Sequence, residues 1–165
     1  MKTIRRVSKD REKKAAKEIG GKAHAGSGAF WSKKSDFSNT NFQIEEKFTY
    51  DDIYSVKLSK LKKIEKEAKE VNKIPAFRFG FIKEKEYNYV ILRRQDCVFD
   101  SEKVSIDLSS CKKSVTMKVN ILKNLYINTP YSIMMSIYIS GEEYLLVEWD
   151  TFVDLHNKIE KGEPI

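Results

Sequence analysis

An acidic pair and a lysine in the N-terminal third of the chain have types and spacing that could support chemistry on a phosphate. The segment FQIEEKFT, residues 42–49, carries Glu45 and Lys47 two positions apart, and Asp36 precedes it. Alternation predicts a β-strand in which Glu45 and Lys47 share one face, with Cα atoms roughly 6.5 Å apart. The NTN turn at residues 39–41 predicts a hairpin. Asp36 can therefore meet both side chains across it.

Glu46 falls on the opposite face of the same predicted strand. Phe42, Ile44 and Phe48 share that face. A carboxylate among apolar side chains is awkward for a structural interpretation, although an edge position would let it reach water.

A third carboxylate lies on a predicted helix, residues 7–19. Ala16 and Ile19 lie about 40° and 20° from Glu12 around the helix, so Glu12 points inward or into a cleft. Glu18 lies about 120° from Glu12, and its replacement by glutamine is expected to matter little. We expect this helix to pack on the sheet and to bring Glu12 to the other charged groups.

Crowded carboxylates repel one another unless a positive charge joins them, and Lys47 supplies one. Hard oxygen ligands without histidine or cysteine favour Mg²⁺ or Mn²⁺ over zinc. Such an ion keeps waters and room for phosphate oxygens, which suits phosphodiester hydrolysis. The spacing alone is a weak signal, because acid-x-Lys triplets and surface salt bridges are common in a chain that is 33% charged.

A loop without periodicity, residues 22–35, leads into Asp36. It gathers residues that could contact a phosphate backbone or a base: Gly26, Ser27, Gly28, Trp31, Lys33 and Lys34. A flexible link is the alternative interpretation of the Gly-Ser-Gly segment. His24 is expected to have a surface role.

The bulk composition predicts a folded protein with a polyanionic partner. The chain of 165 residues fits one domain, 1–165, and its formal charge of +7 suits nucleic acid, although a lysine-rich composition would give the same charge. No apolar run approaches the roughly 18 residues of a membrane span, so no membrane association and a cytoplasmic location are expected. Cys97 and Cys111 lack metal-binding spacing and are expected to be free thiols.

The remaining segments predict further helices and strands around a mixed central sheet. An amphipathic helix is expected at residues 55–72, and a last helix is expected to be capped by Asp150 or Thr151. Residues 93–130 could be helix or strand. The other expected strands are 75–82, 87–92, 131–139 and 144–149. This order predicts an α/β or α+β fold, a mixed central β-sheet flanked by helices.

Four segments together carry a family resemblance: EKKAAKEIGGK, GSGAFWSKKSD, FQIEEKFT and SKLKKIEKEAKEVNKIPAFRFGF. Their order and flanking residues resemble the Holliday junction resolvase-like, often phage-encoded branch of the PD-(D/E)XK nuclease superfamily. The resemblance covers residues 5–92. It implies a restriction-endonuclease-like fold in which residues 1–92 form the catalytic core and residues 93–165 add strands and a C-terminal helix.

The resemblance also implies roles for individual residues. Asp36 and Glu45 match the two acids of the motif and Lys47 matches its lysine. Mg²⁺ or Mn²⁺ would be held by Asp36, Glu45 and the backbone carbonyl of Glu46, while Glu12 would bind a metal-bound water or a second ion. Lys47 would position the attacking water and offset phosphate charge.

The expected function is therefore that of a metal-dependent endonuclease that cuts branched or four-way junction DNA as a two-fold homodimer, in the host cytoplasm if the chain is phage-encoded. Ser27 matches the loop serine that resolvases place near the scissile phosphate. Ser35 departs from the proline or glycine that usually precedes the first acid. Three alternatives stay open: a silent nucleic-acid-binding module of the same fold, a nuclease acting on linear duplex or flap DNA, and an interaction or inhibitor protein without a site.

Overall fold

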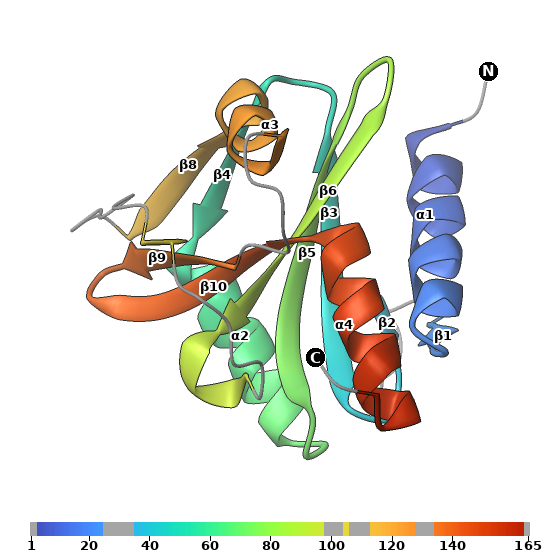
Figure 1. Cartoon of the computed structure of the whole chain (residues 1–165). Coiled ribbons are helices and arrows are strands. Elements are labelled where there is room, and N and C mark those ends of the chain that lie inside the picture. Colours follow the sequence, from blue (N-terminus) through green and yellow to red (C-terminus); the bar gives the residue numbers. More distant parts are fainter. Residues whose placement is uncertain (1–2, 25–34, 98–103, 106–112, 128–133, 164–165) are drawn as a thin grey trace.

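The computed structural model describes residues 3–24, 35–97, 104–105, 113–127 and 134–163. Within these ranges, eight strands form a mixed sheet in the order β1-β2-β3-β5-β6-β10-β9-β7 (Figure 1). These strands are β1 (Lys22–Ala23), β2 (Phe37–Ser38), β3 (Phe42–Thr49), β5 (Ile74–Ile82), β6 (Glu86–Arg93), β7 (Val104–Ser105), β9 (Met135–Ile139) and β10 (Glu142–Glu148). A separate two-stranded sheet pairs β4 (Ile53–Lys57) with β8 (Ser114–Lys118).

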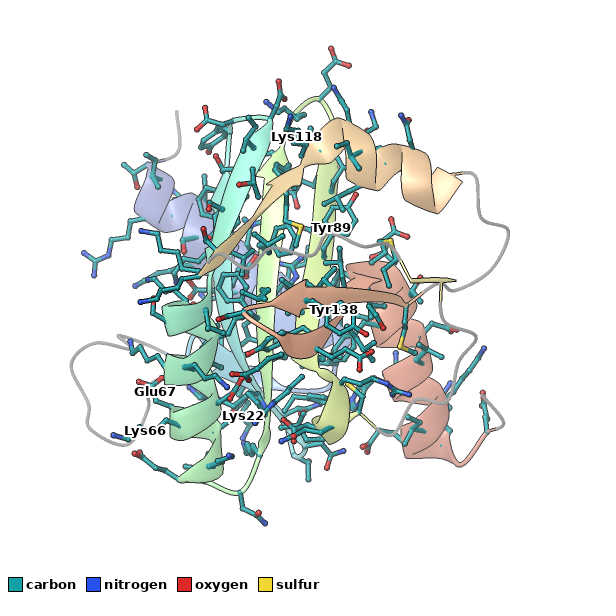
Figure 2. All side chains as sticks on the ribbon, turned by 90° about the vertical axis from the view of Figure 1, so that its left-hand side faces the viewer. Lys22, Lys66, Glu67, Tyr89, Lys118 and Tyr138 are labelled. Atoms are coloured by element: carbon teal, nitrogen blue, oxygen red, sulfur yellow. The ribbon has the colours of Figure 1, made fainter. Side chains whose placement is uncertain are left out.

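Helices cover both faces of the large sheet, which confirms the predicted α+β class with a mixed central sheet flanked by helices (Figure 1). On one face, α1 (Ile4–Glu18) and α4 (Trp149–Lys161) enclose an apolar core with Phe37, Ile44 and Leu92. On the other, α2 (Leu58–Lys69), α3 (Val119–Ile127) and the β4–β8 pair enclose a second core. Side chains fill the space between these elements and the sheet (Figure 2).

The strands that surround the candidate site follow the sequence pattern closely. β2 and β3 form the expected antiparallel hairpin, with Phe37 opposite Ile44. β3 then pairs in parallel with β5, which the chain reaches through β4 and α2. β6 pairs with β10, so both halves of the chain contribute strands to one sheet.

Three local predictions need correction. Residues 55–57 belong to strand β4 rather than to a helix, because they pair with β8 some sixty residues later in the chain. The last helix has Glu148 as its N-cap, so Asp150 and Thr151 lie inside its first turn. Residues 22 and 23, expected to begin a loop, instead form strand β1 and pair with β2. The stretch that could be helix or strand contains both structures, since β8 is followed directly by α3, and a 3₁₀ turn spans Arg94–Asp96.

Among the described residues, no helix is long and apolar enough to cross a membrane. Cys97 is a free thiol, as expected, and Cys111 lies outside the described residues. Burial raises the pKa of Cys97 to about 12, so it is a poor nucleophile.

Candidate active site

The candidate site lies just before the start of β2, where, among the described residues, side chains rather than a paired strand complete the edge of β3. In the described residues β2 pairs with β3 only through Phe37 and Ser38, and the backbone N–H of Asp36 adds one more bond to the carbonyl of Ile44 at 3.1 Å. Two residues further along β3, the Asp36 side chain takes the place of a backbone acceptor, because its Oδ2 accepts the N–H of Glu46 at 2.8 Å. Asp36 is only 8% exposed.

Lys47 brings three oxygen atoms together at this edge. Its Nζ lies 2.6 Å from Glu45 Oε1 and 3.4 Å from Asp36 Oδ2. The same nitrogen donates to the backbone carbonyl of Glu46 at 2.8 Å. The side chains of Asp36 and Glu45 thus converge on one ammonium group, as the strand alternation and hairpin predict.

The four charged side chains of the site, those of Glu12, Asp36, Glu45 and Lys47, approach this edge from both faces of the sheet. Glu45 and Lys47 stand beside Phe77 and Phe79 in the β3–β5 register, and these phenylalanines belong to the core under α2. Glu12 instead comes from α1, which covers the opposite face. The charged side chains therefore meet at the edge of β3, and they do not all lie on one face of the sheet.

Glu12 is half-buried and points into a cleft, as its helical phase predicts. Its Oε1 accepts a hydrogen bond from Ser8 Oγ at 2.7 Å, one helical turn earlier. Burial raises the pKa of the Glu12 carboxyl, and the charge of Asp36 adds to this rise. Glu12 therefore exchanges a proton closer to neutral pH than an ordinary glutamate does.

The cleft has a volume of about 470 Å³, within the range of ligand-binding sites. Its lining comes from α1, from the residue before β2, from the edge of β3 and from the turn that follows β3: Ile4, Ser8, Glu12, Asp36, Glu46, Lys47, Phe48, Thr49, Tyr50 and Asp51. Ile4 is 70% and Tyr50 is 51% exposed, so apolar and aromatic surface faces solvent beside the charged groups.

Lys47 acts as a fixed positive charge. Burial lowers the pKa of an ammonium group, but the hydrogen bond and charge of Glu45 and the charge of Asp36 outweigh it, and the pKa of Lys47 is raised. A lysine in this state is suited to hold an anion or a water, and it is a poor proton acceptor.

Glu46 occupies a different position from the edge site that the sequence suggested. Its side chain lies between the sheet and α1, and the residue is only 4% exposed. Its Oε1 is bound by Arg11 Nη2 at 3.0 Å and by Arg78. Sequence reasoning missed both arginines. The available signal was Arg78 itself, a charged residue in the strand FRFGF that the parallel register places directly beside Glu46.

Six predicted DNA contacts, Gly26, Ser27, Gly28, Trp31, Lys33 and Lys34, lie outside the described residues. His24 is partly buried rather than a simple surface residue. Its ring nitrogens lie 3.2 Å from the Ser35 carbonyl and 3.1 Å from Ser38 Oγ. His24 thus helps to fix the backbone that precedes Asp36.

The donor set at Lys47 fits a hard divalent ion. Within the part of the chain that the structure describes, no group of three or more His, Cys, Asp or Glu side chains is arranged to hold a metal. The oxygens around the Lys47 ammonium are two carboxylates and one carbonyl. Mg²⁺ is commonly held by one or two carboxylates together with waters and substrate phosphates, so the chemistry of these oxygens is compatible with Mg²⁺.

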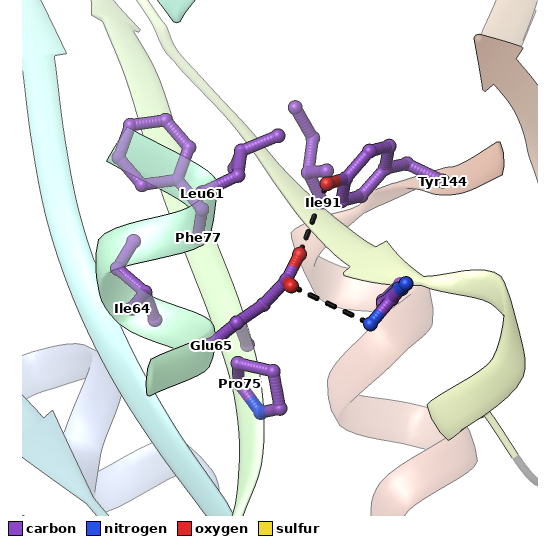
Figure 3. Close-up of a pocket in the computed structure, with 9 residues that line it drawn as sticks. Leu61, Ile64, Glu65, Pro75, Phe77, Ile91 and Tyr144 are labelled. Carbon is purple, nitrogen blue, oxygen red and sulfur yellow. Dashed lines mark hydrogen bonds and ion pairs between the residues drawn. The ribbon is translucent and has the colours of Figure 1, made fainter. Parts of the chain in front are cut away.

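Another buried carboxylate, Glu65 on α2, serves packing instead (Figure 3). Tyr144 donates to its Oε1 at 2.9 Å, and Arg93 lies 3.5 Å from its Oε2. The adjoining cavity measures about 10 Å³, barely the space for one water. This cluster joins α2 to the sheet and leaves no room for a substrate.

Comparison with known proteins adds no assignment: no protein-family model and no curated protein matches the chain. The fold is a mixed α+β domain, and the site is a cleft at the edge of β3. The function is therefore inferred from the geometry of that cleft.

Proposed function

We propose that the protein is a metal-dependent endonuclease that hydrolyses DNA phosphodiester bonds. The observation that carries this proposal is the convergence of Asp36, Glu45 and the Glu46 carbonyl on one cation, Lys47 Nζ, with all three oxygens within 3.4 Å of it. The same atoms are the ones that the PD-(D/E)XK resemblance assigns to the metal and the catalytic lysine. Their position beside a cleft supports an active site.

Asp36, Glu45 and the Glu46 carbonyl would hold Mg²⁺ or Mn²⁺, with Glu12 at a metal-bound water or a second ion. When bound, such an ion favours deprotonation of a water and offsets the charge on the phosphate. The chain's own residues do the remaining work. Lys47, which stays protonated, binds a phosphate oxygen or the attacking water, and Glu12, with its raised pKa, takes up or releases a proton.

A polyanionic substrate is supported by the formal charge of +7 and a pI of about 9.2. The exposed ring of Tyr50 at the cleft mouth offers a surface for a sugar or base. Branched or four-way junction DNA is the proposed substrate, and a two-fold homodimer is the proposed assembly, because two equivalent strands of a junction must be cut.

One experiment tests the activity and the substrate class together. The pure protein is incubated with end-labelled four-way junction, flap and linear duplex DNA, each with Mg²⁺ and with EDTA. Mg²⁺-dependent, symmetric nicks near the branch point are expected. Cleavage of the flap or linear duplex alone would redirect the substrate assignment, and the absence of Mg²⁺-dependent cleavage from all three would overturn the nuclease proposal.

A silent DNA-binding module is the second candidate. It is favoured because Asp36 and Lys47 also have a structural role: they form hydrogen bonds with the amide and the carbonyl of Glu46 at the strand edge. Retention of the junction in a mobility-shift assay without cleavage in Mg²⁺ would support this candidate. Asp154→Asn on α4, where Asp154 pairs only with Lys158 among the interactions described for it, is a suitable control variant for both assays.

A further inference from the structure

Glu46 connects the candidate site to a buried group of charges on the opposite side of β3. Its backbone N–H binds Asp36 Oδ2 and its backbone carbonyl accepts from Lys47, each at 2.8 Å. Its side chain points away from these contacts, into the space between the sheet and α1, where Arg11 and Arg78 bind it. One residue thus holds two members of the site through its main chain and is itself held through its carboxylate.

The two arginines anchor Glu46 to several elements. Arg11, on α1, donates from Nε to Glu46 Oε1 at 3.1 Å. The same guanidinium also donates to Glu86 at 2.8 Å and to Asn88 at 2.6 Å, both at the start of β6. Its guanidinium also lies over the ring of Phe48, at 5.3 Å.

Arg78 extends the same network to the C-terminal helix. It lies on β5 directly beside Glu46 in the parallel register. Its guanidinium carbon stacks 4.6 Å from the centre of the Trp149 ring at the start of α4. The carboxylate of Glu46 is therefore fixed from α1, β5 and α4 together.

We infer that Arg11 and Arg78 are positioning residues for the cleft, because they fix Glu46 and thereby the amide and carbonyl that orient Asp36 and Lys47. The catalytic consequence of this inference rests on the proposed nuclease function, whereas the positioning itself does not.

Stability alone does not account for this arrangement. Buried ion pairs are often no more stabilising than apolar side chains of the same volume, because taking charges out of water is costly. Here, moreover, Glu46 Oε2 and Arg78 Nε have no hydrogen-bond partner among the described residues. A network that leaves buried polar atoms unpaired is better explained by the geometry that it imposes on the main chain of Glu46.

Gly80 offers a way to disturb the network without touching the site. It lies on β5, and a methyl group there would overlap with Arg11 Nη2 and with Asn88 Oδ1. Both atoms are the ends of flexible side chains, so Gly80→Ala displaces the Arg11 guanidinium while the sheet is retained. Arg78→Lys provides a second perturbation, which keeps the charge and loses the planar fork.

The test compares amide hydrogen exchange of Glu46 in the wild-type protein, Gly80→Ala and Arg78→Lys, measured by NMR. We expect the Glu46 amide to exchange at least tenfold faster in both variants, relative to the β3 amides that pair with β5. Tyr144→Phe is the matched control, since it removes a buried hydrogen bond to Glu65 on the other side of the sheet. It should change β3 exchange uniformly or not at all.

Activity provides the second measurement. With a substrate that the wild-type protein cuts, kcat should fall at least tenfold in Gly80→Ala while KM for DNA is unchanged. Unchanged protection of the Glu46 amide would overturn the inference, and faster exchange with unchanged kcat would overturn its catalytic consequence. If the wild-type protein cuts no DNA, the nuclease proposal fails by itself, and the exchange measurement still decides whether the arginines position Glu46.

Discussion

Neutralising Glu46 should destabilise the protein strongly. Glu46→Gln keeps the shape of the side chain but removes the negative charge that Arg11 and Arg78 share. Arg11 retains Glu86, at 2.8 Å. Arg78 is only 3% exposed, and Glu46 is its only partner among the ion pairs described. The variant therefore leaves a buried guanidinium without an acidic side chain in direct contact.

The size of the effect follows from this burial. Breaking a buried ion pair by removing one partner costs about 3–5 kcal/mol, against a total stability of about 5–15 kcal/mol for a typical domain. For a chain of this length, each kcal/mol lowers Tm by roughly 2–4 °C, so Tm should fall by about 6–20 °C. The variant should remain folded at low temperature, with a small free energy of unfolding.

Urea and thermal unfolding at pH 7, followed by circular dichroism, measure this loss. Glu84→Gln in the exposed turn after β5 is the matched control and should stay within about 0.5 kcal/mol of the wild-type protein. The double variant Glu46→Leu/Arg78→Met removes both charges and should recover most of the lost stability. A loss below about 1 kcal/mol for Glu46→Gln would refute the buried network, because a loss of that size is what a solvent-exposed ion pair contributes.

Three further variants separate structural from substrate roles. Because burial raises the pKa of Glu12 above its ordinary value of 4.5, folding favours its protonated form. Its stabilising contribution is present below that ordinary value and is lost as pH rises through the folded pKa, so Glu12→Gln should raise Tm at pH 7, lose this gain in acid and slow cleavage. Tyr144→Phe should cost about 1–3 kcal/mol in urea unfolding by leaving Glu65 Oε1 without its donor, with cleavage unchanged. Tyr50→Ala should weaken DNA binding in EDTA, measured by fluorescence anisotropy, with stability within about 0.5 kcal/mol because the ring is 51% exposed.

The hairpin that carries the site could be predicted because its information is local. Alternation in residues 42–49 and the turn before them define the β2–β3 pairing and separate Glu45 and Lys47 from Glu46. The helical phase of Glu12 likewise depends only on its neighbours along α1. Both predictions are confirmed by the contacts and by the cleft.

The features that were missed depend on partners distant in the chain. Residues 55–57 read as the start of an amphipathic helix, and only pairing with β8 makes them a strand. Glu46 looked anomalous because its partners, Arg11 and Arg78, lie about thirty-five residues before it and thirty-two after it. Glu18 accepts a hydrogen bond from Trp149 Nε1 at 2.7 Å, so it is not the neutral control position that its helical phase suggested.

The most direct test of the proposed site is single-turnover cleavage of a four-way junction by the wild-type protein and by Asp36→Asn at increasing Mg²⁺ concentrations. Asparagine can still accept the Glu46 amide through its side-chain oxygen, so the fold and DNA binding should be retained while the carboxylate charge is lost. We predict that the wild-type rate rises with Mg²⁺ and saturates, and that Asp36→Asn shows only background cleavage at every concentration. Equal rates for the two proteins would contradict the assignment of Asp36 and, with it, the proposed site.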